Sequence, residues 1–152
     1  MNALALLEKD HAKVKELMGK LEKTTAPKER EELFGRLKAN LQVHEIIEEE
    51  IFYPTLKQHP RAKDIVLEGI EEHNVVDRLM GELSAMATKS ETWGPKCKVM
   101  IENIEHHIEE EEGEMFRKAR QVFDRNELEE LGERMTRRKT EATADTRAGS
   151  RR

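Results

Sequence analysis

The sequence is short of cysteine, aromatic residues and long apolar runs. Its one cysteine, Cys97, excludes an internal disulfide and fits a reducing compartment. Aromatic residues make up 4% of the chain, and no Asn-Gly or Asp-Gly turn joins alternating apolar runs, so nothing indicates a β-hairpin. No apolar stretch reaches the length of a membrane span, and no basic segment precedes the short apolar run at Ala3 to Leu7. We therefore expect a cytoplasmic protein without membrane contact.

Charged residues are abundant instead. They make up 39% of the 152 residues and give a formal net charge of −5, which offers no general reason to expect nucleic-acid binding. The C-terminal end is rich in arginine, but acidic residues alternate with the basic ones and no aromatic residue lies among them. This pattern favours a solvated surface over a nucleic-acid contact. A composition rich in Glu, Lys, Leu and Ala is typical of long helices in contact with water.

Apolar residues recur at helical spacing in four long segments, and prolines and a Gly-Pro pair mark the breaks between them. Four long helices joined by short connections pack side by side, so we expect an all-α, antiparallel, up-down-up-down four-helix bundle. The bundle is predicted to cover residues 1–124, followed by a short helix at 125–139 and a disordered tail at 140–152. The four segments are residues 2–23, 27–52, 62–88 and 96–122.

The first helix pair is repeated in the second half of the chain. The segment that begins at His11 reads HAKVKELMGKL, and the segment that begins at His73 reads HNVVDRLMGEL, at an offset of 62 (73 − 11). The pattern N-x3-H-x3-E also occurs twice, ending at Glu48 and at Glu111, at an offset of 63 (111 − 48). A duplicated helix pair packs about a pseudo-twofold axis, so the two sets of residues approach the same region from opposite sides.

The repeated histidines and glutamates have the spacing of metal ligands. A histidine and a glutamate four residues apart lie one turn apart on the same helix face, and imidazole suits iron, zinc and copper. A single histidine on an apolar face is more often a hydrogen-bonded core residue. Here, however, four of the six histidines occupy repeat-related inward positions, and burying so many polar groups without metal would be costly. We therefore predict a two-metal site, bridged by both glutamates, with the ligands His11, His44, Glu48, His73, His107 and Glu111.

The polar residues around these six allow more than one role. Asp77 lies one turn after His73 and could ligate metal, orient a ligand or pair with a basic neighbour. Asn40 and Asn103 lie one turn before the ligand histidines of their helices and could bind them or lie on the surface. Glu45 is expected to be solvated, with a role beside a ligand as the alternative. The predicted surface positions are His106, Glu49, Glu50, Glu110 and Glu112.

At these residues the chain resembles the hemerythrin-like family of HHE cation-binding domains. The resemblance covers roughly residues 4–120 and includes His11, His73 and the motifs HEIIEEEIFYP, from His44, and HIEEEEGEMF, from His107. It implies a four-helix bundle with a non-haem site of two iron ions joined by carboxylate and oxo bridges. Members of the family bind dioxygen reversibly, sense oxygen, iron or redox state, handle nitric oxide, or decompose peroxide.

One position departs from the oxygen-carrying members of the family. They have a further histidine one turn after the third-helix histidine, where this chain has Asp77. The iron site is therefore expected to autoxidise and to favour peroxide turnover or sensing over reversible carriage of oxygen, unless Asp77 turns away from the metals. The ligands that the resemblance implies are dioxygen, hydrogen peroxide and nitric oxide. A catalase-like enzyme, an iron store or sensor, and a structural zinc bundle are the alternatives, in either a monomer or a homo-oligomer.

Overall fold

Every regular element of the described chain is a helix. The computed structural model describes residues 1–150, and no strand occurs in this range, so the all-α prediction is confirmed. None of these helices is both long enough and apolar enough to cross a lipid bilayer. The helices are α1 (Ala3–Lys23), α2 (Pro27–Ile47), α3 (Tyr53–Lys57), α4 (Pro60–Ser84), α5 (Trp93–Glu110), α6 (Phe116–Val122) and α7 (Arg125–Ser150), with the π-helical segments η1 (Glu48–Phe52) and η2 (Glu111–Met115).

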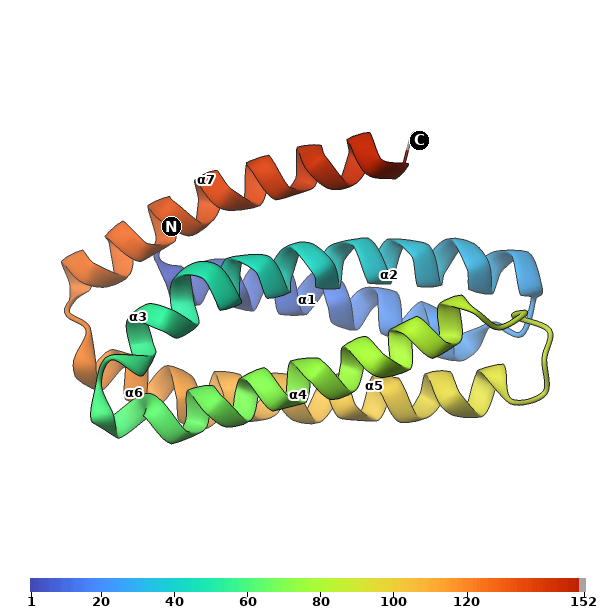
Figure 1. The fold of residues 1–152 in the computed structure, drawn as a ribbon, viewed down its shortest axis with the longest axis horizontal. Helices are drawn as coiled ribbons and strands as arrows, with labels where there is room; N and C mark the ends of the chain where they lie inside the picture. Colours follow the sequence, from blue (N-terminus) through green and yellow to red (C-terminus); the bar gives the residue numbers. More distant parts are fainter. Residues whose placement is uncertain (151–152) are drawn as a thin grey trace.

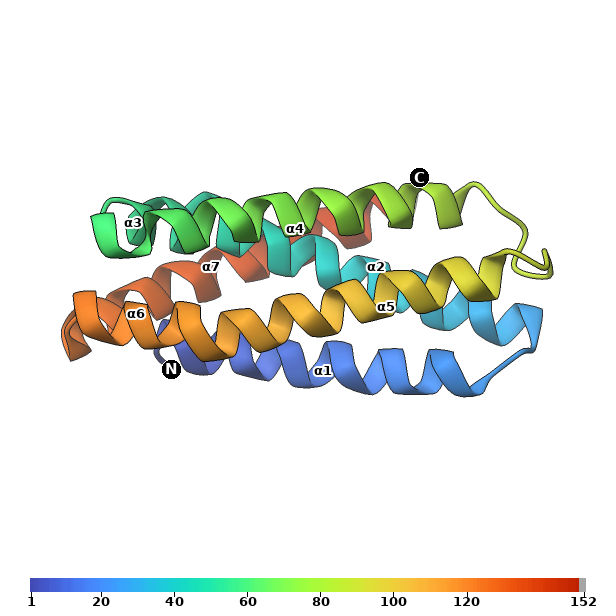
Figure 2. The same cartoon turned by 90° about the horizontal axis from the view of Figure 1, so that it is seen from below.

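Helices α1 to α6 form four rods along the longest axis of the molecule (Figure 1). α1 and α4 are single helices, whereas α2 continues through η1 into α3, and α5 continues through η2 into α6. Consecutive rods are joined at alternate ends, so the chain reverses direction between them (Figures 1 and 2). α1 packs on α2 and α4 packs on α5, while α7 returns along the outside of the α1–α2 pair.

Local sequence explains where the long helices begin. The Asn2 side chain accepts a 2.8 Å hydrogen bond from the Ala5 N–H and caps α1. Pro27 and Pro60 stand in the first turns of α2 and α4, where a missing N–H loses no helical hydrogen bond. Pro54 does not end its rod, because it lies in the first turn of α3 directly after η1.

Two apolar clusters fill the interior, one near α3 and α6 and the other toward the α4–α5 connection. Each of the four rods contributes to both clusters. In α1, for example, Leu7 belongs to the first cluster and Val14 to the second, with His11 between them. In α4, His73 likewise lies between Val66 and Val76. The helices therefore carry a buried polar layer between two apolar layers.

The C-terminal helix is longer than the sequence predicted. α7 continues to Ser150, so the prediction of a short helix at 125–139 with a disordered tail after it is wrong up to that residue, and residues 151–152 lie outside the described range. One face of α7 packs on the bundle along its length. Beyond residue 139, however, the buried residue of that face is a small alanine, so the sequence shows no stripe of large apolar side chains there and did not predict a helix. The buried residues of this face with side chains are Leu128, Leu131, Met135 and Ala142.

A glycine lets the start of the chain pack against α7. A Cβ on Gly132 would lie 2.2 Å from the carbonyl oxygen of Met1 and 2.7 Å from the carbonyl carbon of Asn2. Both distances are shorter than van der Waals contact, so a larger residue would force the backbone of the N-terminus or of α7 to move. Gly132 therefore fixes how closely α7 approaches α1.

Candidate metal centre

Six buried side chains meet in the polar layer. They are the six ligands that the repeat predicts, and none is more than 7% exposed. Two of the histidines come from α1 and α2 and two from α4 and α5, while the two glutamates are the first residues of η1 and η2. All four rods therefore contribute to one site.

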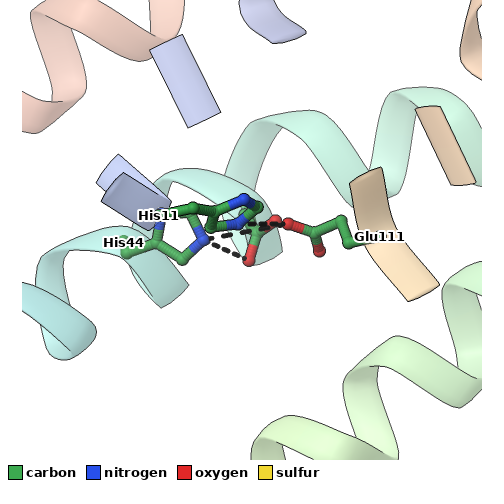
Figure 3. A group of neighbouring side chains, drawn as sticks. His11, His44 and Glu111 are labelled. Carbon is green, nitrogen blue, oxygen red and sulfur yellow. Dashed lines mark hydrogen bonds and ion pairs between the residues drawn. The ribbon is translucent and has the colours of Figure 1, made fainter. Parts of the chain in front are cut away.

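The six side chains form two groups that share both glutamates. In each group the candidate ligand atoms lie within 4.8 Å of one another. Figure 3 shows His11, His44 and Glu111 of the first group pointing toward one another. A carboxylate has two oxygens, so a glutamate that belongs to both groups can join two cations. The first group is His11, His44, Glu48 and Glu111, and the second is Glu48, His73, His107 and Glu111.

The Nε2 atom of every histidine in these groups faces a shared glutamate. Nitrogen and oxygen atoms that converge at this separation can hold a cation between them once the histidine has lost its Nε2 proton. His11 Nε2 lies 3.0 Å from Glu111 Oε1, His107 Nε2 lies 3.2 Å from Glu111 Oε2, and His44 Nε2 and His73 Nε2 each lie 3.1 Å from Glu48 Oε1.

Several of these atoms lack a hydrogen bond. His44 Nε2 and both carboxylate oxygens of Glu48 are buried, and no hydrogen bond satisfies them within the described chain. Burying unsatisfied polar atoms is costly, whereas coordination of a cation uses the same lone pairs. Imidazole nitrogen and carboxylate oxygen together suit iron and zinc. The residues present therefore fit a dinuclear metal site with Glu48 and Glu111 between the two positions.

The Nδ1 atom of each histidine contacts a second carboxylate. Because the Nδ1–H donates to that carboxylate, the ring is held in one orientation and the Nε2 lone pair is left for a metal. The four pairs are His44 with Asp10 (3.0 Å), His73 with Glu49 (2.9 Å), His107 with Glu72 (2.7 Å) and His11 with Glu112 (2.6 Å).

These four carboxylates follow the repeat. Asp10 and Glu72 each precede a ligand histidine by one residue, and Glu49 and Glu112 each follow a shared glutamate by one residue. Asp10 and Glu72 were not predicted as histidine partners from the sequence. Glu49 and Glu112, predicted to face mostly water, are 41% and 32% exposed, and each also binds a ligand histidine, which was not predicted. An acidic residue at the same repeat position in both halves was the signal that could have identified them.

Nearby carboxylates raise the pKa values of His73 and His107. Burial alone would lower the pKa of His73, but the carboxylate of Glu48, 3.1 Å from Nε2, and that of Glu49, 2.9 Å from Nδ1, raise it to about 9. Burial also opposes charge on His107, whereas the charge of Glu111 and its hydrogen bond raise the pKa to about 11. Both histidines are therefore protonated at neutral pH in the metal-free protein, and a metal ion must displace a proton from each.

The hydroxyl of Tyr53 also reaches the site. It donates a 2.6 Å hydrogen bond to Glu111 Oε2 and lies 3.4 Å from the Nε2 atoms of His73 and His107. The tyrosine ring stacks on the ring of His73, with centroids 5.4 Å apart. The repeat-related residue, 63 positions later (116 − 53), is Phe116, which has no hydroxyl. The second group therefore has a phenol that the first group lacks.

The π-helical segments explain why the sequence analysis missed Tyr53. In a regular α-helix, five residues at about 100° each would place Tyr53 about 140° around the helix from Glu48. In the structure the Tyr53 N–H donates to Glu48 O, five residues back, and the wider turn directs both side chains to the site. The equivalent hydrogen bond joins Phe116 N–H to Glu111 O at the end of η2.

The other candidate residues lie outside the two groups. Asp77 is exposed and adjoins Glu45, so it does not stand among the six buried side chains. Glu45 is buried, contrary to the prediction that it is solvated, and burial raises its pKa to about 8. Asn40 and Asn103 each donate to a backbone carbonyl of their own helix, which assigns them the surface role. His106 is 64% exposed, as predicted.

A small cavity adjoins the four histidines. Its volume is about 20 Å³. A water molecule needs roughly 10–15 Å³ of such space, so the cavity has room for one very small molecule. Glu45 also lines the cavity, and the apolar residues of its wall are Val14, Leu41, Val76, Ile104 and Ile108.

The sequence profile of the hemerythrin HHE cation-binding domain matches residues 2–119. This range contains all six side chains of the two groups. The chain belongs to this family. The resemblance predicted from the sequence is thereby confirmed, and so is the coarser prediction of metal binding, because the hemerythrin HHE domain is a cation-binding domain and the buried histidines and glutamates supply the ligands.

Similar proteins support the hemerythrin fold. The crystal structure of a hemerythrin HHE cation-binding domain-containing protein from Mycobacterium kansasii is 27% identical and has a TM-score of 0.89, covering 99% of this chain and 93% of that one. An uncharacterized protein of Mycobacterium tuberculosis is 31% identical over 140 residues, covering 91% of this chain and 85% of the relative. A DNA nickase of Nostoc sp. is 24% identical over 130 residues, and the match covers 86% of this chain but only 37% of that relative.

Proposed function

We propose that this chain is a non-haem di-iron protein that binds dioxygen, hydrogen peroxide or nitric oxide within an antiparallel four-helix bundle. The observation that carries the proposal is the pair of four-residue groups that share Glu48 and Glu111. The histidines of α1 and α2 would hold one iron, those of α4 and α5 would hold the other, and the two glutamates would bridge them. Bound iron supplies the redox and Lewis-acid chemistry.

A structural zinc site is the main alternative for the metal. Structural zinc is enclosed by four protein ligands of its own, usually including cysteine. Here the two positions share their carboxylates and adjoin a cavity, and Cys97 lies in the apolar cluster away from the site. These features favour a centre that admits an external ligand, and the family resemblance favours iron.

The size of the cavity limits the ligand class. A volume of about 20 Å³ accommodates a molecule of two or three non-hydrogen atoms and is too small for larger organic substrates. Five of the residues that line the cavity are apolar, which suits uncharged molecules such as dioxygen, nitric oxide and hydrogen peroxide. The protein thus contributes a small, partly apolar space beside the metals.

The surrounding residues orient the ligands and hold a proton. The four carboxylates at the Nδ1 atoms fix the imidazole rings, so the histidines are positioned before metal binds. The Tyr53 hydroxyl donates its proton in a hydrogen bond to Glu111 Oε2. Burial and the charges of Glu111 and Glu48 hold the pKa of Tyr53 well above its usual range, so the phenol stays protonated while no metal is bound.

Peroxide decomposition is the second candidate function. It is favoured by Tyr53, because reduction of peroxide to water needs protons at the site and the phenol is the proton donor that reaches the second group. Asp77, which the sequence analysis weighed as a cause of the same reactivity, lies outside both groups. We therefore base the proposed preference for peroxide turnover over oxygen carriage on Tyr53 and not on Asp77.

Metal analysis followed by ligand reactions tests the proposal. Protein made in iron-replete medium should contain about two irons per chain, in line with two groups of ligands. After anaerobic reduction, addition of dioxygen or nitric oxide should change the absorption spectrum, and a peroxide turnover assay separates the enzyme from the binding protein. A folded protein that takes up no more than one tightly bound metal would contradict the dinuclear proposal.

A further inference from the structure

A lysine of α7 stands behind one of the histidines of the metal centre. Lys139 Nζ donates a 2.5 Å hydrogen bond to Asp10 Oδ1, and the other oxygen of this carboxylate binds His44 Nδ1 at 3.0 Å. On the far side of its ring, His44 Nε2 lies 3.1 Å from Glu48 Oε1. A continuous chain of contacts therefore leads from α7 to a candidate ligand atom of the first group.

The packing of α7 fixes where this lysine stands. Met135, four residues earlier, and Ala142, three residues later, lie on the same helix face and are buried. Beside the lysine, the Arg138 guanidinium binds both carboxylate oxygens of Glu50, each at 3.1 Å, and holds α7 against η1. The helix therefore directs Lys139 toward the bundle and not into open solvent.

The ion pair between this lysine and its carboxylate is partly shielded from water. The Asp10 side chain is only 10% exposed, and that of Lys139 is 35% exposed. Opposite charges on an open surface interact weakly, because water and salt screen them, whereas a pair with a largely buried partner is screened less. The charge of Lys139 should therefore act on Asp10 and, through it, on His44.

This lysine distinguishes His44 from the other ligand histidines. Among the lysines of residues 1–150, Lys139 is the only one that forms an ion pair with any of the four carboxylates at the Nδ1 atoms. The repeat-related carboxylate is Glu72 (10 + 62), which adjoins His106 at 3.8 Å. α7 has no counterpart in the duplication and lies along the α1–α2 pair (Figure 1), so its lysine stands behind the first group and not the second.

We propose that Lys139 is a positioning residue of the metal centre, which acts through Asp10 and His44 to raise the reduction potential of iron held by the first group. The inference rests on the proposed di-iron function. A carboxylate that accepts the Nδ1 hydrogen bond makes imidazole a stronger donor to metal, and a stronger donor stabilises ferric over ferrous iron. Lysine shares the negative charge of Asp10 and weakens this effect. Its own positive charge also disfavours the more highly charged ferric ion.

A redox titration of the iron-loaded, full-length chain tests this role. The variants are Lys139→Met, which removes the charge at similar length, and Lys139→Arg, which keeps it. The matched control is Arg137→Met, which removes one positive charge from an exposed position of the same helix. Dithionite, added without oxygen, supplies one electron per iron, and absorbance follows the reduction.

We expect Lys139→Met to favour ferric iron roughly tenfold in at least one of the two one-electron steps, a fall of about 59 mV in its midpoint potential. A unit charge has an effect of this size over about 10 Å at an effective dielectric constant of about 20. Lys139→Arg and Arg137→Met should keep the wild-type potentials. An equal fall in Arg137→Met would show a general effect of charge and would overturn the role of Lys139.

Nuclear magnetic resonance of the metal-free protein with isotope-labelled histidine provides a second readout. In Lys139→Met the Nδ1–H proton of His44 should move downfield, because its hydrogen bond to a carboxylate without lysine is stronger, and that of His73 should stay in place. An unmoved His44 resonance, or wild-type potentials in a variant with two irons bound, would overturn the inference and leave the dinuclear centre intact. A wild-type chain that holds no more than one iron would overturn the di-iron function and the redox role together.

Discussion

At the scale of single residues, Glu111 is a central residue of the metal centre, because it contacts side chains from both ligand groups. It contacts His11, His107 and Tyr53 and belongs to both ligand groups. Glu111→Ala would remove a bridging carboxylate and leave buried imidazoles without their partner, a change that costs roughly 3–5 kcal/mol when a buried ion pair is broken. We expect the variant to retain less than half of the wild-type iron by elemental analysis and to unfold at a lower temperature.

Glu109→Ala is the matched control for this substitution. Glu109 is exposed and lies two residues earlier on α5, so its loss changes the charge by the same amount without reaching the site. Its iron content should equal that of wild type. Equal iron contents in the two variants would refute the bridging role of Glu111.

Tyr53→Phe isolates the phenolic hydroxyl. Phenylalanine already stands at the repeat-related position 116, so the ring should fit, and the loss of one hydrogen bond changes the free energy of unfolding by roughly 1 kcal/mol. We expect two irons per chain to remain, while peroxide turnover falls by roughly a hundredfold, the lower range for loss of a general acid. If turnover per iron is unchanged in Tyr53→Phe, the phenol is not the proton donor.

The residues of the site differ in how well the sequence revealed them. The histidines and the shared glutamates were predictable, because spacing along one helix and the repeat determine which face they occupy. The repeat marks Asp10 and Glu72 as equivalent acidic positions, but their histidine partners were not predictable, because each binds a histidine on a neighbouring helix and pairing between helices depends on packing. Glu45 was misjudged for the same reason, since its burial depends on α4 and not on its own helix.

At the scale of elements, the contact of α7 with the N-terminus gives a sharp test. Gly132→Ala places a Cβ 2.2 Å from Met1 O, so the backbone must shift, and overpacking of this kind costs roughly 1–3 kcal/mol. Gly19→Ala, in the middle of α1 with no atom within 4 Å of the added Cβ, should instead stabilise the protein by up to about 1 kcal/mol. Urea unfolding measures both, and the prediction fails if the two variants shift in the same direction.

The rods were easier to predict than the irregularities within them. Their apolar stripes gave the four long segments, because a period of 3.6 residues persists over many turns. The π-helical segments were not predictable, since an i, i+5 turn leaves no periodic mark in the sequence and becomes visible only where Tyr53 and Phe116 follow the shared glutamates. The extent of α7 was underestimated, because its continuation depends on a surface offered by α1 and α2.

At the scale of the whole molecule, α7 completes the core. Its residues Leu128, Leu131 and Met135 join the apolar cluster near α3 and α6. In addition, Lys139 Nζ donates a 2.5 Å hydrogen bond to Asp10 Oδ1, and Asp10 also binds His44. Burial of each large apolar side chain contributes roughly 1.5–3 kcal/mol, so removing residues 125–152 should lower the melting temperature by roughly 10 °C or more. Calorimetry measures the shift. An unchanged melting temperature would show that residues 1–124 fold independently of α7, as the domain boundary predicted from the sequence implies.

The shared glutamates come from different halves of the duplicated chain. Glu48 belongs to the first helix pair and Glu111 to the second, so metal bound by both would connect the halves across a loop of 63 residues (111 − 48). With a single cysteine, the chain cannot form that connection as a disulfide. Iron would thus act as a reversible cross-link, and the protein's resistance to unfolding and proteolysis would rise and fall with the supply of iron in its surroundings.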